Sequence, residues 1–329
     1  HAGIRDLDSS LVGSEMCIRD RSTDEGLGGE VTWEHRNLAG RQERLTTSLR
    51  LEEVRQELDI RFRKPRFLAE RQTLLASVQL SVEDTDAYQG SLINGALGLD
   101  RRLGQYWTAS GSLWAEASEL EDYLGERRFD LQGLELDLRR NSANDPLDPS
   151  RGWRMDLALL PYHISGDDNL DVLQGTLGLR GYLPLGKQSG PVLAARAKFG
   201  VIADQDPEVL PANRRFYAGG GSSIRGYALQ SVGPVTDSGQ PTGGNALVEL
   251  GAELRFRFSE SLGGVLFAEG GNVFEDSKPD PTRELRWAAG AGLRFFTAVG
   301  PVRLDVGVPI DPRDSDDDFQ FYISVGQAF

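Results

Sequence analysis

Several segments of this chain place apolar residues on one face and charged residues on the other, with a repeat of two. Between 284 and 296, one face carries Leu285, Trp287, Ala289, Ala291, Leu293 and Phe295, and the other carries Arg286, Gly290, Gly292 and Arg294. The segment 246–258 repeats this, with Val248, Leu250, Ala252, Leu254, Phe256 and Phe258 opposite Glu249, Glu253, Arg255 and Arg257. A repeat of two is that of a strand with two different faces.

Two arginines on one strand face are rare in a soluble β-sandwich, so this pattern favours a transmembrane antiparallel β-barrel. In such a barrel the apolar face contacts lipid, the charged face lines a wet lumen, and the strands satisfy each other's backbone hydrogen bonds. We therefore expect Trp287, Leu293, Leu304 and Val306 to point outward, and the arginines of the same strand to point into the lumen.

The composition excludes two other classes of protein. No stretch approaches the roughly 18 consecutive apolar residues that a membrane-spanning helix needs, and the mean hydropathy is −0.38. The net charge of −14 argues against a nucleic-acid partner, because phosphate binding needs clustered Lys and Arg. The single cysteine, Cys17, permits no internal disulfide and therefore does not decide the redox compartment.

Turn residues divide the chain from Ser22 onward into short segments of about 12–16 residues, as expected of strands joined by turns. We expect fifteen strands, at approximately 28–36, 43–54, 55–63, 72–86, 91–102, 105–119, 127–140, 151–164, 170–183, 190–203, 245–258, 262–274, 284–297, 301–309 and 319–329. Bacterial barrels normally have an even strand number. Because Ser22–Gly26 resembles the end of a truncated first strand and its turn, we expect sixteen strands in the intact protein.

Residues 1–21 differ from the rest of the chain. They lack the basic start and the apolar run of a signal peptide, and SLVGSEMCIRDR resembles translated sequencing-adapter sequence. We interpret 1–21 as a non-native or disordered leader that either lacks order or imitates the first strand imperfectly. Residues 22–329 are expected to form one barrel domain.

The connections between the expected strands form two alternating sets. One set is acidic: EDTD at 83–86, ELEDYLGE at 119–126, GDD at 166–168, DQDPE at 204–208, EDSKPD at 275–280 and DPRDSDDD at 311–318. The other consists of Gly/Pro turns such as PLGKQSGP at 184–191, FSESLG at 258–263 and TAVGP at 297–301. Because such barrels carry long loops outside and short turns on the periplasmic side, we place the acidic set outside. The exceptions are the long inner connection 140–152 and the short outer one at 54–55.

The longest connection, 204–244, contains RFYAGGGSSIRGYALQSVGP, and here the sequence resembles a known family. With Ile224-Arg225-Gly226-Tyr227 matching its [VI]RG[FY] motif, the chain is similar to the outer-membrane barrel-assembly and surface-antigen superfamily of insertases and transporters. Within that superfamily it looks most like the barrel subunit of the translocation and assembly module. Four further blocks follow in the family's order: 243–256, 266–274, 286–310 and 319–329.

The resemblance implies a long outer loop that folds back into the barrel, where the motif arginine meets acidic residues of the inner wall. Carried over to this chain, Arg225 is expected to pair with Glu253 and with Glu269, which stands where the family more often has Asp. A guanidinium in a confined lumen needs such carboxylates in good geometry. Placing Glu269 inward also places Val265 and Phe267 inward, so strand 262–274 lacks clean alternation.

The last residue, Phe329, follows Phe321, Ile323 and Val325 in alternation. This ending is similar to the C-terminal strand signal by which such barrels are themselves recognised for insertion.

The sequence shows no chemistry of an enzyme. Outside the leader only His35 and His163 occur, and neither stands in a metal-ligand spacing or beside a nucleophile motif. We expect no catalytic residue, no cofactor and no metal site, and we interpret the acidic runs as solvated loops, with a divalent-cation site bridging lipopolysaccharide as the alternative.

The resemblance implies a bacterial outer-membrane protein that inserts, assembles or translocates other proteins through a lateral seam between its first and last strands. Its implied partners are outer-membrane lipid and lipopolysaccharide, substrate outer-membrane proteins or autotransporters, and an inner-membrane or periplasmic assembly partner, with periplasmic modules upstream. The alternative is a two-partner secretion-type transporter or a passive pore, which shares the loop motif. The residues themselves do not decide between these.

Overall fold

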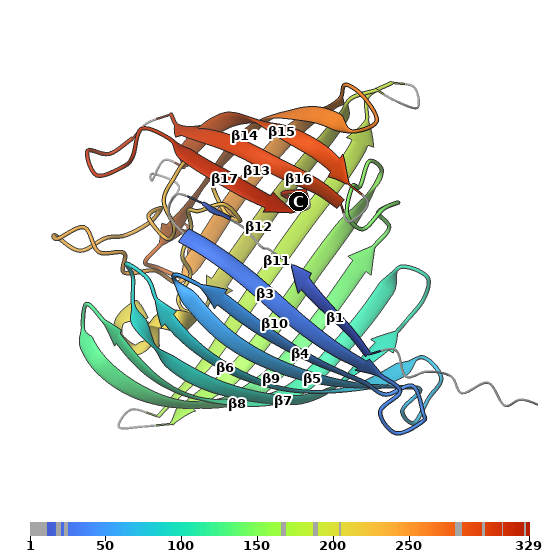
Figure 1. Cartoon of the computed structure of the whole chain (residues 1–329). Helices are drawn as coiled ribbons and strands as arrows, with labels where there is room; N and C mark the ends of the chain where they lie inside the picture. The colour runs from blue at the N-terminus through green and yellow to red at the C-terminus, as the bar shows by residue number, and fades with distance from the viewer. Residues whose placement is uncertain are drawn as a thin grey trace, which may run out of the picture.

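The structure is a computed structural model that describes residues 12–17, 21–22, 26–165, 169–186, 190–203, 205–279, 285–297, 300–310, 312–325 and 327–329. It is a single antiparallel sheet wound into a barrel (Figure 1). Among the described residues, no helix is long and apolar enough to cross a membrane.

Fifteen strands follow one another around the barrel, each antiparallel to its neighbour, as the alternation predicts. They are β3 (Gly26–Arg36), β4 (Arg44–Glu52), β5 (Arg55–Pro65), β6 (Gln72–Asp84), β7 (Gln89–Arg102), β8 (Trp107–Asp122), β9 (Gly125–Asn141), β10 (Gly152–Ser165), β11 (Leu170–Pro184), β12 (Val192–Ile202), β13 (Ala246–Arg257), β14 (Leu262–Phe274), β15 (Arg286–Thr297), β16 (Gly300–Pro309) and β17 (Gln320–Val325). The prediction of an all-β antiparallel barrel is confirmed.

Two short strands fill the seam between β3 and β17. β1 (Val12–Cys17) pairs with β3 from Val12 opposite His35 to Cys17 opposite Glu30. β2 (Arg21–Ser22) pairs with both β3 and β17. In the described residues the link from β2 to β17 consists of two residue pairs, whereas β16 and β17 share six. The seam is therefore the weakest junction in the sheet. Most of the leader lies outside the described residues, and its foreign origin stays a prediction.

The two faces of the strands have the predicted polarity. Trp287, Leu293 and Val306 are 38%, 45% and 42% exposed on the outer surface, and Leu304, on the same face as Val306, is half-buried. The arginines that alternate with them, Arg286 and Arg294, are buried toward the lumen. Apolar residues therefore face lipid and charged residues face the interior, as a membrane barrel requires.

The prediction of a last strand reaching residue 329 is wrong. β17 ends at Val325, and Phe329 lies in the lumen. There the Arg255 guanidinium donates to the Phe329 carbonyl oxygen at 2.6 Å, and the Phe329 side chain is buried against Tyr182 and Ala194. Alternation alone places Phe329 on the lipid face with Val325. The lumen instead supplies a hydrogen-bond donor and an aromatic contact that lipid lacks.

The connection 142–151 between β9 and β10 lies at the rim of the barrel that the sequence predicts to be the inner one. The Gln327 side-chain amide donates to Asp148 at 2.9 Å, and the Arg257 guanidinium lies 3.4 Å from the same carboxylate. Asp145 and Asn144 accept backbone N–H groups of the connection and fix its shape. The long inner connection expected from the sequence thus holds the C-terminal residues in place.

Candidate functional site: a loop anchored in the lumen

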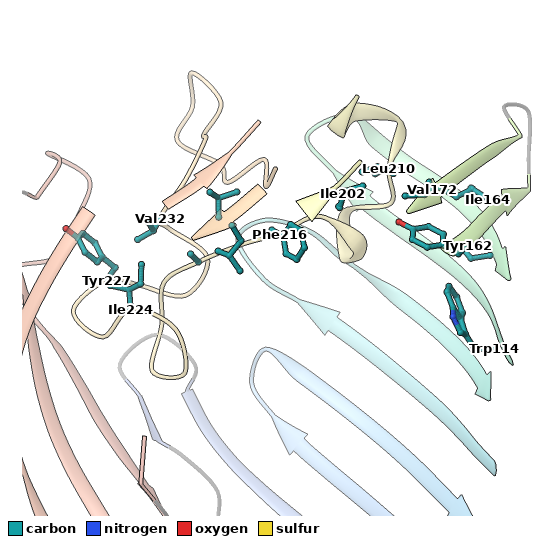
Figure 2. Close-up of a cluster of buried hydrophobic side chains, with 14 of the residues drawn as sticks. Trp114, Tyr162, Ile164, Val172, Ile202, Leu210, Phe216, Ile224, Tyr227 and Val232 are labelled. Carbon is teal, nitrogen blue, oxygen red and sulfur yellow. The ribbon is translucent and has the colours of Figure 1, made fainter. Parts of the chain in front are cut away.

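The connection between β12 and β13 enters the barrel instead of extending away from it. It contains two short 3-10 helices, η1 (Pro207–Val209) and η2 (Ala212–Arg214), and three isolated β-bridges, the first between Phe216 and Gly244. Its apolar side chains form one buried cluster with inward residues of the wall, running from Ile224 and Tyr227 to Trp114 on β8 (Figure 2). The loop therefore crosses the lumen from one wall to the other.

Arg225 is fully buried at the point where the loop is bonded to the wall of the barrel. We call Arg225 and its carboxylate partners the anchor. One guanidinium nitrogen, Nη2, donates to Glu253 on β13 and to Glu269 on β14, each at 2.7 Å. The Arg225 Nε and backbone N–H both donate to the other oxygen of Glu269, at 3.1 and 2.8 Å. The structure thus brings together the three residues that the family resemblance pairs. Charge-assisted bonds of this kind fix orientation as well as adding energy.

A third carboxylate also bonds Arg225, and the sequence did not predict it. Asp305 on β16 accepts from Arg225 Nη1 at 2.8 Å and is also bonded by Arg294 of β15. A signal for it existed, because Asp305 alternates with Arg303 on the charged face of its strand, between Leu304 and Val306. What the sequence does not show is that β16 brings this face within reach of the loop.

The lumen around the anchor is balanced in charge. Besides Arg225, three wall arginines contact the acidic residues: Arg255 bonds Glu253 at 2.8 Å, Arg294 bonds Asp305, and Arg196 lies 3.4 Å from Glu269. Burial alone would lower the pKa of Arg225, but the carboxylates of Glu269, Glu253 and Asp305 outweigh burial and hold this pKa well above its ordinary value. The guanidinium therefore stays charged, and each buried charge has a partner.

The aromatic ring of Phe267 packs against the Arg225 guanidinium. The Arg225 guanidinium lies 3.7 Å from the centroid of the Phe267 ring, and Phe267 is buried beside Val265. The inward position of Phe267 in the broken alternation of 262–274 therefore has a structural cause, because the Arg225 guanidinium of the loop lies on its ring. A flat guanidinium suits this position because it can stack on a ring while its edge donates to carboxylates.

The neighbours of Arg225 in the motif pack against the same wall. Ile224 and Tyr227 are buried, the Tyr227 hydroxyl donates to the Trp287 carbonyl at 3.0 Å, and the Arg286 guanidinium lies 4.4 Å from the Tyr227 ring. Gly226 has φ of +110°, a backbone conformation that side chains rarely adopt. Each of the four motif residues thus has a distinct structural requirement.

The other end of the loop is held by β8. Arg214 bonds Glu116, the Asn213 side-chain amide donates to the same carboxylate at 3.0 Å, and Arg215 lies 2.8 Å from Asp122. The Arg214 guanidinium also lies 4.5 Å from the Trp114 ring centroid. The loop therefore has two charged attachments on opposite sides of the lumen, of which the sequence analysis identified one.

β17, the strand at the seam, also contacts the motif. The Tyr322 hydroxyl accepts from the Gly226 N–H at 3.1 Å and donates to the Tyr227 carbonyl oxygen at 3.2 Å. Phe321, Ile323 and Val325 alternate with it on the opposite face, and Phe329 lies inside the lumen. Their role as a C-terminal signal stays a prediction.

We expect Tyr322→Phe to loosen the motif modestly, because two neutral hydrogen bonds contribute about 1 kcal/mol each and the ring remains. Hydrogen exchange of the Gly226 and Tyr227 amides measures this, and the amides of β9 provide the internal reference. Equal protection in the wild type and the variant would show that the Tyr322 hydroxyl does not hold the loop.

Within the described residues, no group of His, Cys, Asp and Glu is arranged to hold a metal. His163 lies near the outer end of β10, where its Nδ1 is 2.8 Å from Asp171. The observed arrangement is therefore one of charge pairing and packing, which can hold a loop against a wall.

An antiparallel sheet wound into a barrel, with lipid-facing apolar residues, a charged lumen and an inward-folded loop, defines an outer-membrane β-barrel. The Omp85 superfamily domain matches residues 37–329, and the chain belongs to that superfamily.

The chain is also similar to three individual proteins. It is 30% identical over 172 residues to outer membrane protein assembly factor BamA of Nitratidesulfovibrio vulgaris, a match that covers 50% of this chain and 21% of that protein. BamA from Haemophilus ducreyi lacking POTRA domains 1–3 has a similar structure, with a TM-score of 0.80, 17% identity and coverage of 95% of this chain and 70% of that one. CdiB from Acinetobacter baumannii gives a TM-score of 0.66 at 15% identity, covering 95% of this chain and 60% of that one. The matched part of the chain thus spans about a fifth of the length of the BamA relative.

Proposed function

We propose that this chain is the barrel of an outer-membrane assembly or translocation factor that receives substrate proteins at the seam between β3 and β17. The observation that carries the proposal is the contact of the lumen-anchored loop with β17, the strand at this seam, through the Tyr322 hydroxyl. Membership of the superfamily and the match to an outer-membrane protein assembly factor support the general class. A role like that of TamA, the barrel subunit of the translocation and assembly module, is the finer form of the proposal.

The proposed mechanism is strand addition. If the β2–β17 pairs separate, the edge of β17 exposes unpaired backbone N–H and C=O groups, and a substrate strand can satisfy them by β-augmentation. Separation is inexpensive here because few backbone hydrogen bonds are lost. The substrates are therefore expected to be chains that form antiparallel strands in the membrane, such as outer-membrane proteins or autotransporters. The chain is expected to act without covalent chemistry.

The anchored loop is proposed to hold the strands next to the seam in fixed positions on the lumen side. Arg225 connects β13, β14 and β16 through their carboxylates, and Tyr322 connects the same motif to β17. A loop that crosses the lumen with charged attachments on both walls also argues against a freely open pore. No observation on this chain specifically favours a secretion-type transporter.

We expect a disulfide across the seam to stop substrate insertion. Arg21 and Ile323 are register partners in β2 and β17, and paired strand residues have Cα atoms about 4.5–5.5 Å apart, within reach of a disulfide. The test variant is Arg21→Cys with Ile323→Cys in a Cys17→Ser background. Liposomes containing it are supplied with an unfolded substrate barrel, and protease-resistant inserted substrate is measured before and after reduction.

The matched control moves one cysteine to the other side of β17. Leu304 and Ile323 are register partners in β16 and β17, so Leu304→Cys with Ile323→Cys locks the same strand away from the seam. Insertion should stop in the oxidised seam variant, return on reduction, and continue in the oxidised control. Full insertion by the oxidised seam variant would contradict entry through the seam.

A further inference from the structure

The lipid-facing surface of β8, β9 and β10 ends at the inner rim in three aromatic residues around one arginine. The Arg140 guanidinium lies 3.7 Å from the ring centroid of Trp153, 5.4 Å from Tyr106 and 5.9 Å from Trp107. Tyr106 and Trp153 are 44% and 41% exposed, so the cluster is open to its surroundings. We call these four residues the aromatic–arginine cluster.

Strand register places Arg140 on the outward face. On β9 it lies on the same face as the lipid-facing residues Leu136 and Leu138. Its register partners are Trp107 on β8 and Met155 on β10. Leu136 is 43% exposed, as expected of a residue in contact with lipid. Arg140 is therefore at the end of an apolar column and outside the lumen.

The position of Arg140 along β9 indicates its depth in the membrane. Asp130 and Arg140 lie on the same face of β9, ten residues apart by number, with Gln132 and three leucines between them on that face. At about 3.3 Å per residue and a tilt near 45°, this is about 23 Å along the membrane normal, close to the ~25 Å apolar band of an outer-membrane barrel. If the acidic end of β9 is at the outer surface, Arg140 lies at the headgroup level of the periplasmic leaflet, where aromatic belts are found.

The two ends of the column differ in charge balance. At the outer end, Arg128 forms an ion pair with Glu119 at 2.9 Å. At the inner end, no carboxylate of the described residues lies within 4.0 Å of the Arg140 guanidinium, which has one hydrogen bond to the Ser142 hydroxyl at 2.8 Å. A guanidinium has five N–H donors in a flat fork. Stacking on Trp153 fixes that plane while its remaining edge stays free to donate.

We propose that the aromatic–arginine cluster is a binding site for the phosphate of a phospholipid in the periplasmic leaflet. The free edge of Arg140 donates to two phosphate oxygens, a geometry that guanidinium groups favour. The three rings pack beside the glycerol region, where amphipathic aromatic side chains reside at membrane interfaces. The phosphate supplies the negative charge that the barrel provides for Arg128 but not for Arg140.

Native mass spectrometry of the whole chain in a neutral detergent tests the site. Phosphatidylglycerol is titrated, and the first bound lipid is compared for the wild type, Arg140→Ala and Arg140→Lys. Because it removes the charge-assisted hydrogen bonds to the phosphate, Arg140→Ala should weaken the binding of the first lipid by about tenfold or more. Arg140→Lys keeps the charge without the flat fork and should give an intermediate affinity.

Arg128→Ala is the matched control, because it removes an arginine from the same face of the same strand at the opposite end. It should leave the affinity for the first lipid unchanged. Diacylglycerol, which lacks phosphate, should bind the wild type as weakly as phosphatidylglycerol binds Arg140→Ala. Equal binding of the two lipids, or equal losses in Arg140→Ala and Arg128→Ala, would overturn the proposal. Displacement of the lipid by millimolar inorganic phosphate would assign the site to a free anion instead.

Discussion

Arg225→Ala is expected to release the loop from the wall and to impair the proposed assembly activity while the barrel stays folded. The substitution leaves Glu253, Glu269 and Asp305 buried around an empty space, each without its bond to Arg225. Breaking a buried ion pair in this way typically costs about 3–5 kcal/mol. The strands keep their own hydrogen bonds, so the loss falls on docking of the loop.

Two measurements separate the loop from the barrel. Limited proteolysis should cleave the region 215–234 in Arg225→Ala and not in the wild type, and circular dichroism in detergent should give the same β signal for both. Arg225→Lys is the control for charge. It should restore only part of the protection, because Lys cannot reach three carboxylates with a flat fork. A protected loop in Arg225→Ala would show that the apolar cluster alone holds it.

Gly307→Val on β16 is expected to displace the motif Ile224–Tyr227 from the wall by a steric clash. A Cβ atom at Gly307 on β16 would lie 2.7 Å from the backbone nitrogen of Gly226 and 2.8 Å from the carbonyl carbon of Arg225. Both are backbone atoms, so no side chain can rotate away. Overpacking of this kind typically costs about 1–3 kcal/mol, and a valine adds more than one atom. We expect undocking of the loop and a loss of activity approaching that of Arg225→Ala.

Gly181→Val on β11 provides the control, because nothing lies within 4 Å of a Cβ atom at that position. Valine favours strands, so neither substitution is expected to weaken its strand by propensity. The loop position can be measured as the distance between spin labels on Ser238 and on Leu124 of the rim. If Gly307→Val gives the wild-type distance, the close approach of Gly226 to β16 is not required for docking.

Much of the barrel follows from local residue patterns. The two-faced alternation of 246–258 and 284–296 predicts β13 and β15 closely, because the side-chain repeat of a strand is two and lipid and water demand opposite faces. The same argument places Trp287 and Leu293 outward. It fails at the chain end, where Phe329 has the parity of a lipid-facing residue and lies in the lumen.

The anchor was partly predictable. Glu253 stands on the charged face of its strand, and the resemblance of Ile224–Tyr227 to a family motif points to Arg225 as its partner. Glu269 was less evident because Val265 and Phe267 share its face, and the inward position of Phe267 is explained only by the Arg225 guanidinium that lies on its ring. Asp305 and the second attachment at Glu116 were not predicted at all.

The sequence by itself determined the class of fold, the strands and their faces, because these depend on neighbours in the chain and on the solvent each face meets. The central arginine of the loop came from the resemblance of Ile224–Tyr227 to a family motif. Only the tertiary structure decided which carboxylates share Arg225, how Tyr322 joins the loop to the seam, and where Phe329 is held. Those contacts join residues as far apart as Asp148 and Gln327. Their existence depends on strand register and on the curvature of the closed sheet, which no local pattern of residues records.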